Sequence, residues 1–222
     1  MTINIFTHEP TSIDTLTKIR AELPSYLSGK RLLHTLSVEK EALRLSGMIF
    51  PYLGIDEKYL SDISASALLH DITKQFSFEK QKELCEKYAI KHQNEVGDAV
   101  LHSKTGAFFA REKYDVNDFV FGAIFFHTTG KEDMNIFEKI IFISDYIEET
   151  RTHTNCIEAR EYFYSNAKDS NDLIKTLDMT IMMGLDSTQS YLEDKKENID
   201  SQTIKARNFL LAEYALQRSV QE

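Results

Sequence analysis

The sequence has no tryptophan and only two cysteines, three prolines and eight glycines among its 222 residues. Cys85 and Cys156 lie far apart and form no CxxC pair, so the sequence indicates neither a disulfide framework nor a cysteine-based zinc site. So few glycines and prolines leave little material for a linker between domains, and they favour helices. These scarcities predict one continuous, largely helical domain in a reducing compartment.

Positive charge is also in deficit, because 26 Lys and Arg face 35 Asp and Glu and give a formal net charge of −9. Such a balance is poorly suited to a broad grip on a nucleic-acid backbone, so we expect no long nucleic acid as a partner. A small anionic substrate is not excluded. A few local cations or a metal ion can reverse the field within one pocket whatever the total charge.

Long apolar runs are missing as well. The most apolar segment, residues 119–126, is far shorter than the roughly 20 residues that cross a bilayer, and the N-terminus has no basic and apolar regions typical of a secretory signal. We therefore expect a cytoplasmic protein with no membrane partner. The sequence also has no Walker motif, glycine-rich phosphate loop or GxGxxG pattern, which argues against the common kinase and dinucleotide-binding folds.

Helical spacing of apolar residues runs through nearly the whole chain, with almost no alternation of the strand type. The pattern predicts an all-α fold, with Ser77 and Asn117 as helix N-caps and a helix end near Pro51. The expected helices cover residues 14–23, 30–48, 57–74, 78–88, 95–114, 118–127, 135–149, 157–164, 172–193 and 201–217.

Ionisable residues interrupt the apolar faces of several of these helices. His70 and Lys74 follow Ile63 and Ala67 at helical spacings of four, three and four, so Asp71 and its two charged neighbours are expected to project toward one side. An imidazole, a carboxylate and an ammonium group would then lie close together.

Four further polar residues fall at similar places. His34 lies one turn before Val38 and Asp145 one turn beyond Ile141, while His102 and His127 lie on or at the end of apolar helices. One such histidine alone is more often a hydrogen-bonded core residue, but four histidines and two aspartates are too many to bury unpaired. Imidazoles with a few carboxylates are the ligands expected for Fe, Mn, Co or Zn, and an aspartate can bridge two ions.

The order of these six residues resembles the HD superfamily of metal-dependent phosphohydrolases. The resemblance is carried by the blocks RLLHTL (31–36), ALLHDITK (67–74), LHSKTGA (101–107), FHTTG (126–130) and EKIIFISDYIE (138–148). The same blocks, with IKARNFLL (204–211), resemble the bacterial YqeK family of symmetrical bis(5'-nucleosyl)-tetraphosphatases. One departure is Lys104-Thr105, which stands in place of a Pro-Val-like pair, and neither position needs to bind a metal.

The resemblance implies a single-domain HD-type helical bundle with a C-terminal helical extension. In that arrangement residues 1–29 form an N-terminal helical extension, 30–155 the HD core, and 156–222 helices that complete the same domain. It also implies that diadenosine tetraphosphate, or a related dinucleoside polyphosphate, is hydrolysed at its centre to two nucleoside diphosphates, ADP in the first case. The implied cofactor is iron, as one or two ions, with manganese or cobalt as substitutes.

The resemblance also implies roles for individual residues. His34, His70, Asp71 and Asp145 would hold the main metal, while His102 and His127 either complete a second metal position or touch the phosphates. The implied catalytic residues are Asp71, Lys74, His102 and His127. The implied substrate-binding residues are Arg31, Asp71, Ile72, Thr73, Lys74, His102, His127, Thr128, Asp145, Arg151, Lys196, Glu197, Asn198, Ile199, Asp200, Ser201 and Arg207.

The chemistry of the reaction agrees with this allocation. Hydrolysis of a phosphoanhydride needs a nucleophilic water and positive charge beside oxygens that are already anionic. A metal can lower the pKa of bound water to about 7, so no side-chain nucleophile is required.

Alternatives remain at this stage. The first alternative to the tetraphosphatase is another HD phosphohydrolase, acting on a deoxynucleotide, a cyclic nucleotide or a guanosine alarmone. The second is a helical domain that binds nucleotide or a partner protein without turnover. The presence of all six ligands favours catalysis. Arg207 is also a candidate ion-pair partner for Glu213 or another acid, and His8, His92 and His153 are expected at the surface. A homodimer is left open.

Overall fold

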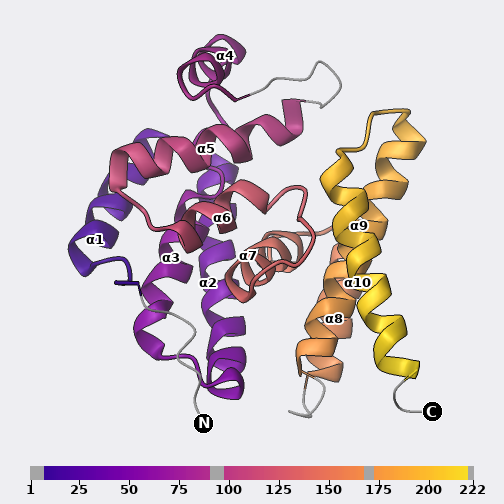
Figure 1. Ribbon diagram of the computed structural model, residues 1–222. Coiled ribbons are helices and arrows are strands. Elements are labelled where there is room, and N and C mark those ends of the chain that lie inside the picture. Colours follow the sequence, from indigo (N-terminus) through magenta and orange to yellow (C-terminus); the bar gives the residue numbers. More distant parts are fainter. Residues whose placement is uncertain (1–7, 91–97, 168–172, 220–222) are drawn as a thin grey trace.

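The computed structural model describes residues 8–90, 98–167 and 173–219, and in these ranges it contains helices and no β-strand (Figure 1). The all-α prediction is confirmed. The α-helices are α1 (Ile13–Glu22), α2 (Gly29–Leu53), α3 (Leu60–Leu69), α4 (Phe78–Lys87), α5 (Asp98–Tyr114), α6 (Asp118–Phe126), α7 (Ile136–Ile147), α8 (Thr154–Asn166), α9 (Leu173–Lys195) and α10 (Ser201–Ser219). Two short 3₁₀ helices cover Leu23–Ser25 and Glu57–Tyr59. None of the helices in these ranges is long and apolar enough to span a membrane.

Side chains at helix starts fix several of these boundaries. Ser77 accepts a hydrogen bond from the N–H of Lys80, and Asn117 accepts from the first turn of α6, so both predicted N-caps are confirmed. Asn135 and Glu138 form a capping box that begins α7. Caps of this kind bind backbone N–H groups that have no partner within the helix.

The core is built around α7. A large apolar cluster joins α2 and α7 to the C-terminal helices through fully buried side chains such as Ile49, Phe137, Phe163 and Ile181. Figure 1 shows α8, α9 and α10 lying along one side of the molecule, next to α7. A second cluster, which includes Leu68, lies among α1, α3, α5 and α6. The C-terminal helices therefore share their apolar core with α2 and α7.

Polar contacts also join the C-terminal helices to the remainder of the chain. Lys139 of α7 pairs with Asp178 of α9 at 2.6 Å, and Lys104 of α5 lies 3.7 Å from Asp200, just before α10.

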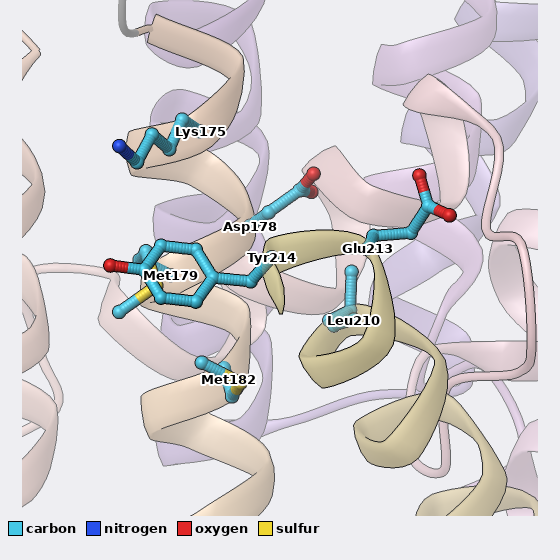
Figure 2. Close-up of a pocket in the computed structure, with 7 residues that line it drawn as sticks. All are labelled: Lys175, Asp178, Met179, Met182, Leu210, Glu213 and Tyr214. Atoms are coloured by element: carbon cyan, nitrogen blue, oxygen red, sulfur yellow. The ribbon is translucent and has the colours of Figure 1, made fainter. Parts of the chain in front are cut away.

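Between α9 and α10 themselves lies a small cleft that contains none of the predicted site residues (Figure 2). Its lining is Lys175, Asp178, Met179, Met182, Leu210, Glu213 and Tyr214.

The largest differences from the predicted helix boundaries are at the ends of the second and third helices. The expected helix over residues 57–74 is a 3₁₀ turn followed by α3, which ends at Leu69, and the chain then continues in turns. The helical spacing predicted for Lys74 is therefore wrong. Its backbone N–H donates to the oxygen of Asp71, three residues earlier, in a turn after the helix has ended. The second helix continues past the expected stop at Pro51 and ends at Leu53, and Gly54, with a φ of 68°, provides a left-handed cap.

The prediction that His8 lies at the surface is wrong. Its Nε2 lies 2.8 Å from a carboxylate oxygen of Asp62, which is fully buried and also accepts a hydrogen bond from Asn117. A buried carboxylate needs such partners, and this one links the segment before α1 to α3 and α6. His153 is exposed as predicted, and His92 lies outside the described residues.

Candidate metal centre

The structure brings the six predicted ligands together from five helices. His34 lies on α2, His70 and Asp71 follow the end of α3, and His102 lies on α5. His127 follows the last residue of α6, and Asp145 comes from α7. The residues are spread over more than 100 positions of the sequence, so their meeting depends on the packing of the whole helical core.

Asp71 is at the middle of the cluster. One of its oxygens lies 3.0 Å from His102 Nε2 and 3.9 Å from His127 Nε2. Its other oxygen lies 3.4 Å from His70 Nε2 and 3.8 Å from His34 Nε2. The carboxylate therefore faces histidines on both sides, as a bridge between two ions would.

Three overlapping sets of donor atoms are compact enough to hold a metal ion. In each set one ligand atom per residue lies within 4.8 Å of the others, and the sets share members, so they describe one continuous cluster. They are His34 with His70 and Asp71, His70 with His127 and Asp145, and Asp71 with His102 and His127.

Buried ring nitrogens that face carboxylate oxygens form a donor set that fits a metal. Nε2 of His34 lies 3.0 Å from Oδ1 of Asp145, Nε2 of His70 lies 3.4 Å from Oδ2 of Asp71, and both nitrogens are buried. The Nδ1 atoms of His70 and His127 bond instead to the backbone oxygens of Ala67 and Ile124, both at 2.7 Å. Each of these two rings thus turns Nε2, with its lone pair, toward the cluster.

The electrostatics give these groups the protonation states that metal binding requires. Burial alone would raise the pKa of Asp71, but the positive charge of His70 and a hydrogen bond from His102 hold that pKa well below its usual range. Burial, with the charges of His70 and His102, lowers the pKa of His127 to about 3. At neutral pH the carboxylate is charged and this imidazole is neutral.

Three cations border the cluster. Arg31 pairs with Asp71 at 2.6 Å, Lys74 Nζ lies 3.0 Å from His102 Nδ1, and Arg151 pairs with Asp145. Burial lowers the pKa of the Lys74 ammonium, and the nearby charge of Asp71 opposes that effect. Arg31 and Arg151 are each about one-third exposed, which gives both guanidinium groups access to a solvent-borne anion.

The other predicted substrate residues fall into two groups. Thr128 Oγ1 lies 3.2 Å from His127 Nε2, at the cluster. The side chains of Ile72 and Thr73 are fully buried, and the Thr73 hydroxyl donates to the backbone oxygen of His102. The Thr73 hydroxyl is thus engaged within the protein, and contact of these two residues with substrate stays a prediction.

The predicted substrate residues of the C-terminal part contact helices α5 and α9, and their neighbour Ala206 lies close to the segment after His127. Gly130, three residues after His127, has a φ of +64°, and a Cβ there would lie 3.1 Å from Ala206 of α10. Residues 196–200 form the loop between α9 and α10, and Asp200 of this loop lies 3.7 Å from Lys104 of α5. Arg207 pairs with Asp186 of α9, which matches the alternative of an ion pair with an acid other than Glu213.

No function was predicted from the sequence for one residue that contacts a predicted ligand. Glu148, at the C-cap of α7, is fully buried, and its Oε1 lies 3.0 Å from Nδ1 of His34. It stands within the matching block that contains Asp145, but the two partners are 114 positions apart. Sequence spacing could not pair them.

Comparisons with known proteins agree with this geometry. A family model described as the HD domain matches residues 31–150, more than half of the chain. The chain belongs to the HD domain family. A solved structure from Clostridium acetobutylicum, described as a "predicted HD superfamily hydrolase involved in NAD metabolism", superposes with a TM-score of 0.71 at 29% identity, covering 92% of this chain and 99% of that one.

Within this family the chain is similar to curated proteins named "Bis(5'-nucleosyl)-tetraphosphatase, symmetrical". The protein of that name from Halalkalibacterium halodurans is 31% identical over 85% of this chain and 92% of its own length. The one from Staphylococcus aureus is 30% identical over 82% of this chain and 88% of its own length. The resemblance seen in the sequence is confirmed, as is the expectation that the chain is an enzyme.

Proposed function

We propose that this chain hydrolyses diadenosine tetraphosphate, or a closely related dinucleoside polyphosphate, at its centre, so that one water and one substrate give two nucleoside diphosphates. The observation that carries the proposal is the meeting of six metal-type ligands in one cluster bordered by three cations. The names of the relatives at 31% and 30% identity support the substrate class. We include in the proposal iron as the metal, with manganese or cobalt as substitutes, and a cytoplasmic location.

We include in the proposal a main metal held by His34, His70, Asp71 and Asp145. These residues would hold a divalent ion, which would supply Lewis acidity to lower the pKa of a water to about 7 and to polarise a phosphate oxygen. The bordering cations, Arg31 among them, neutralise the phosphate oxygens as the bond to the leaving diphosphate breaks. His102 and His127 complete a second metal position or contact the phosphates.

Substrate entry must displace the cations from their present partners. Arg151 bonds to the carboxylate of Asp145 and, through Nε, to the backbone oxygen of the same residue at 2.8 Å. A metal ion on Asp145 would neutralise that carboxylate and leave the planar guanidinium available for a phosphate. The three cations at the cluster suit a small polyanion as substrate despite the −9 net charge of the chain.

The proposed function is tested by product analysis. The purified protein, with its metal content determined, is incubated under reducing conditions with diadenosine tetraphosphate and added ferrous, manganous or cobaltous ion, and products are separated by chromatography. We expect ADP as the only product. AMP together with ATP would keep a metal-dependent hydrolase but exclude symmetrical cleavage. No turnover with any of the metals would favour another nucleotide substrate or a binding function.

Arg151→Ala should weaken catalysis without removing the metal. A hydrogen bond to a charged group contributes about 1.5–3 kcal/mol, so we expect kcat/KM to fall about 10- to 100-fold. Steady-state kinetics and metal analysis of the same preparation check this. Arg111→Ala is the matched control, because Arg111 pairs with the exposed Asp118 away from the cluster. Loss of bound metal from Arg151→Ala would contradict a phosphate contact.

A further inference from the structure

The buried histidines of the centre are not all oriented by the same kind of partner. His70 and His127 each donate from Nδ1 to a backbone oxygen three residues earlier. Both follow the last residue of a helix, α3 and α6 respectively. The carbonyl groups of a last helical turn have no partner within the helix, so they are free to accept from these rings.

His34 has no free carbonyl of this kind, because it lies inside α2, where the preceding carbonyls bond to the helix itself. Its Nδ1 meets Oε1 of Glu148 instead, at 3.0 Å. The backbone of Glu148 leaves the helical conformation with a ψ of 156°, which turns the chain out of α7 at this residue. His34 therefore depends on a side chain for an acceptor that His70 and His127 obtain from the backbone.

The carboxylate of Glu148 is itself held in place. Thr150 donates to it twice, from its N–H at 2.5 Å and from its hydroxyl at 2.7 Å. The side chain of Glu148 has no exposed surface, and a buried carboxylate without partners would be costly. Since a carboxylate only accepts, Nδ1 of His34 must be the donor in their contact, and Nε2 of the neutral ring then carries the lone pair.

Arg160 of α8 holds the backbone around this carboxylate. Its Nε donates to the backbone oxygen of Ile147 at 2.5 Å, and its Nη2 donates to the backbone oxygens of Glu148 and Arg151, the latter at 3.0 Å. The segment between α7 and α8 is thereby fixed at three carbonyl groups. A helix beyond the predicted core thus holds the residue that orients one of the ligands.

We propose that Glu148 is a positioning residue of the metal centre, which holds His34 in the tautomer and orientation that turn Nε2 toward Asp71 and Asp145. The inference rests on the metal centre of the proposed function and adds to it a residue outside the six ligands. Carboxylates behind a metal-binding histidine act in this way, and their loss commonly weakens metal binding about 10- to 100-fold.

The first test is a cobalt(II) titration of the full-length, metal-free protein, followed by visible absorption. Glu148→Ala should weaken cobalt binding about 10- to 100-fold. Glu148→Gln retains an oxygen that accepts from Nδ1 and should restore most of the affinity. Glu149→Ala is the matched control, because this neighbouring side chain is 60% exposed and pairs with Lys40, and it should bind cobalt like the unmodified protein.

The outcomes separate this inference from the proposed centre. If His34→Ala weakens cobalt binding while Glu148→Ala behaves like Glu149→Ala, the positioning role is overturned and the centre stands. If His34→Ala has no effect, the centre itself is overturned. Because Glu148→Ala could fail to fold, ¹⁵N NMR of the zinc-loaded, unmodified protein gives a second readout: protonated Nδ1 and metal-bound Nε2 in His34 support the inference, and the reverse tautomer overturns it.

Discussion

Replacing Asp71 with alanine should abolish hydrolysis of diadenosine tetraphosphate and retention of the metal, while the far-UV circular dichroism spectrum stays that of a helical protein. Asp71 belongs to two of the three ligand sets, so its loss affects both sides of the cluster. Removal of one charge-stabilising group from an active site commonly costs about 10²–10³ in rate. Loss of a shared ligand should exceed that range.

The helical fold should survive this change because the affected groups can find other partners. Arg31, which pairs with Asp71, is about one-third exposed and can reach water, and the apolar clusters do not include Asp71. Asp118→Ala serves as control, since its carboxylate is 93% exposed and pairs only with Arg111 among the ion pairs of the described residues. Full activity of the Asp71 variant would refute the metal assignment.

Local spacing accounts for what the sequence could predict. Each of the six predicted ligands lies on an apolar helix or within two residues of its end, and apolar helical faces turn toward the core. Helix starts could also be predicted from local sequence, because a cap such as Ser77 bonds to a backbone N–H only three residues away. Order along the chain and local pattern were therefore enough to pick out six residues that the fold brings together.

Contacts between distant segments account for what the sequence could not predict. The pair His34–Glu148 and the pair His8–Asp62 join positions 114 and 54 residues apart. No local pattern distinguishes such a glutamate or histidine from a solvated one. Lys74 illustrates the same limit, since it reaches His102 from a turn that interrupts an otherwise helical pattern.

Removal of the metal should inactivate the enzyme and lower its thermal stability. A ligand that binds only the folded state, present at about 100 times its dissociation constant, stabilises that state by about 2.7 kcal/mol. For a domain of this size, such a change corresponds to a fall in Tm of about 5–10 °C. Calorimetry of the chelated and the manganese-reloaded protein measures the difference. Asp71→Ala is the control and should show no change in Tm on addition of manganese.

The stabilisation by metal should also decrease as the pH falls, because protons compete with the metal for His34. Burial would lower the pKa of this ring, but the carboxylates of Asp145 and Glu148 outweigh burial and raise it above the ordinary value of 6.5. A metal binds the neutral ring, so below the raised pKa it must displace a proton, and its affinity should fall about tenfold per pH unit for each proton displaced. The Tm difference should therefore shrink as the pH falls below that pKa. A difference that stays constant across this range would show that the metal does not bind through His34.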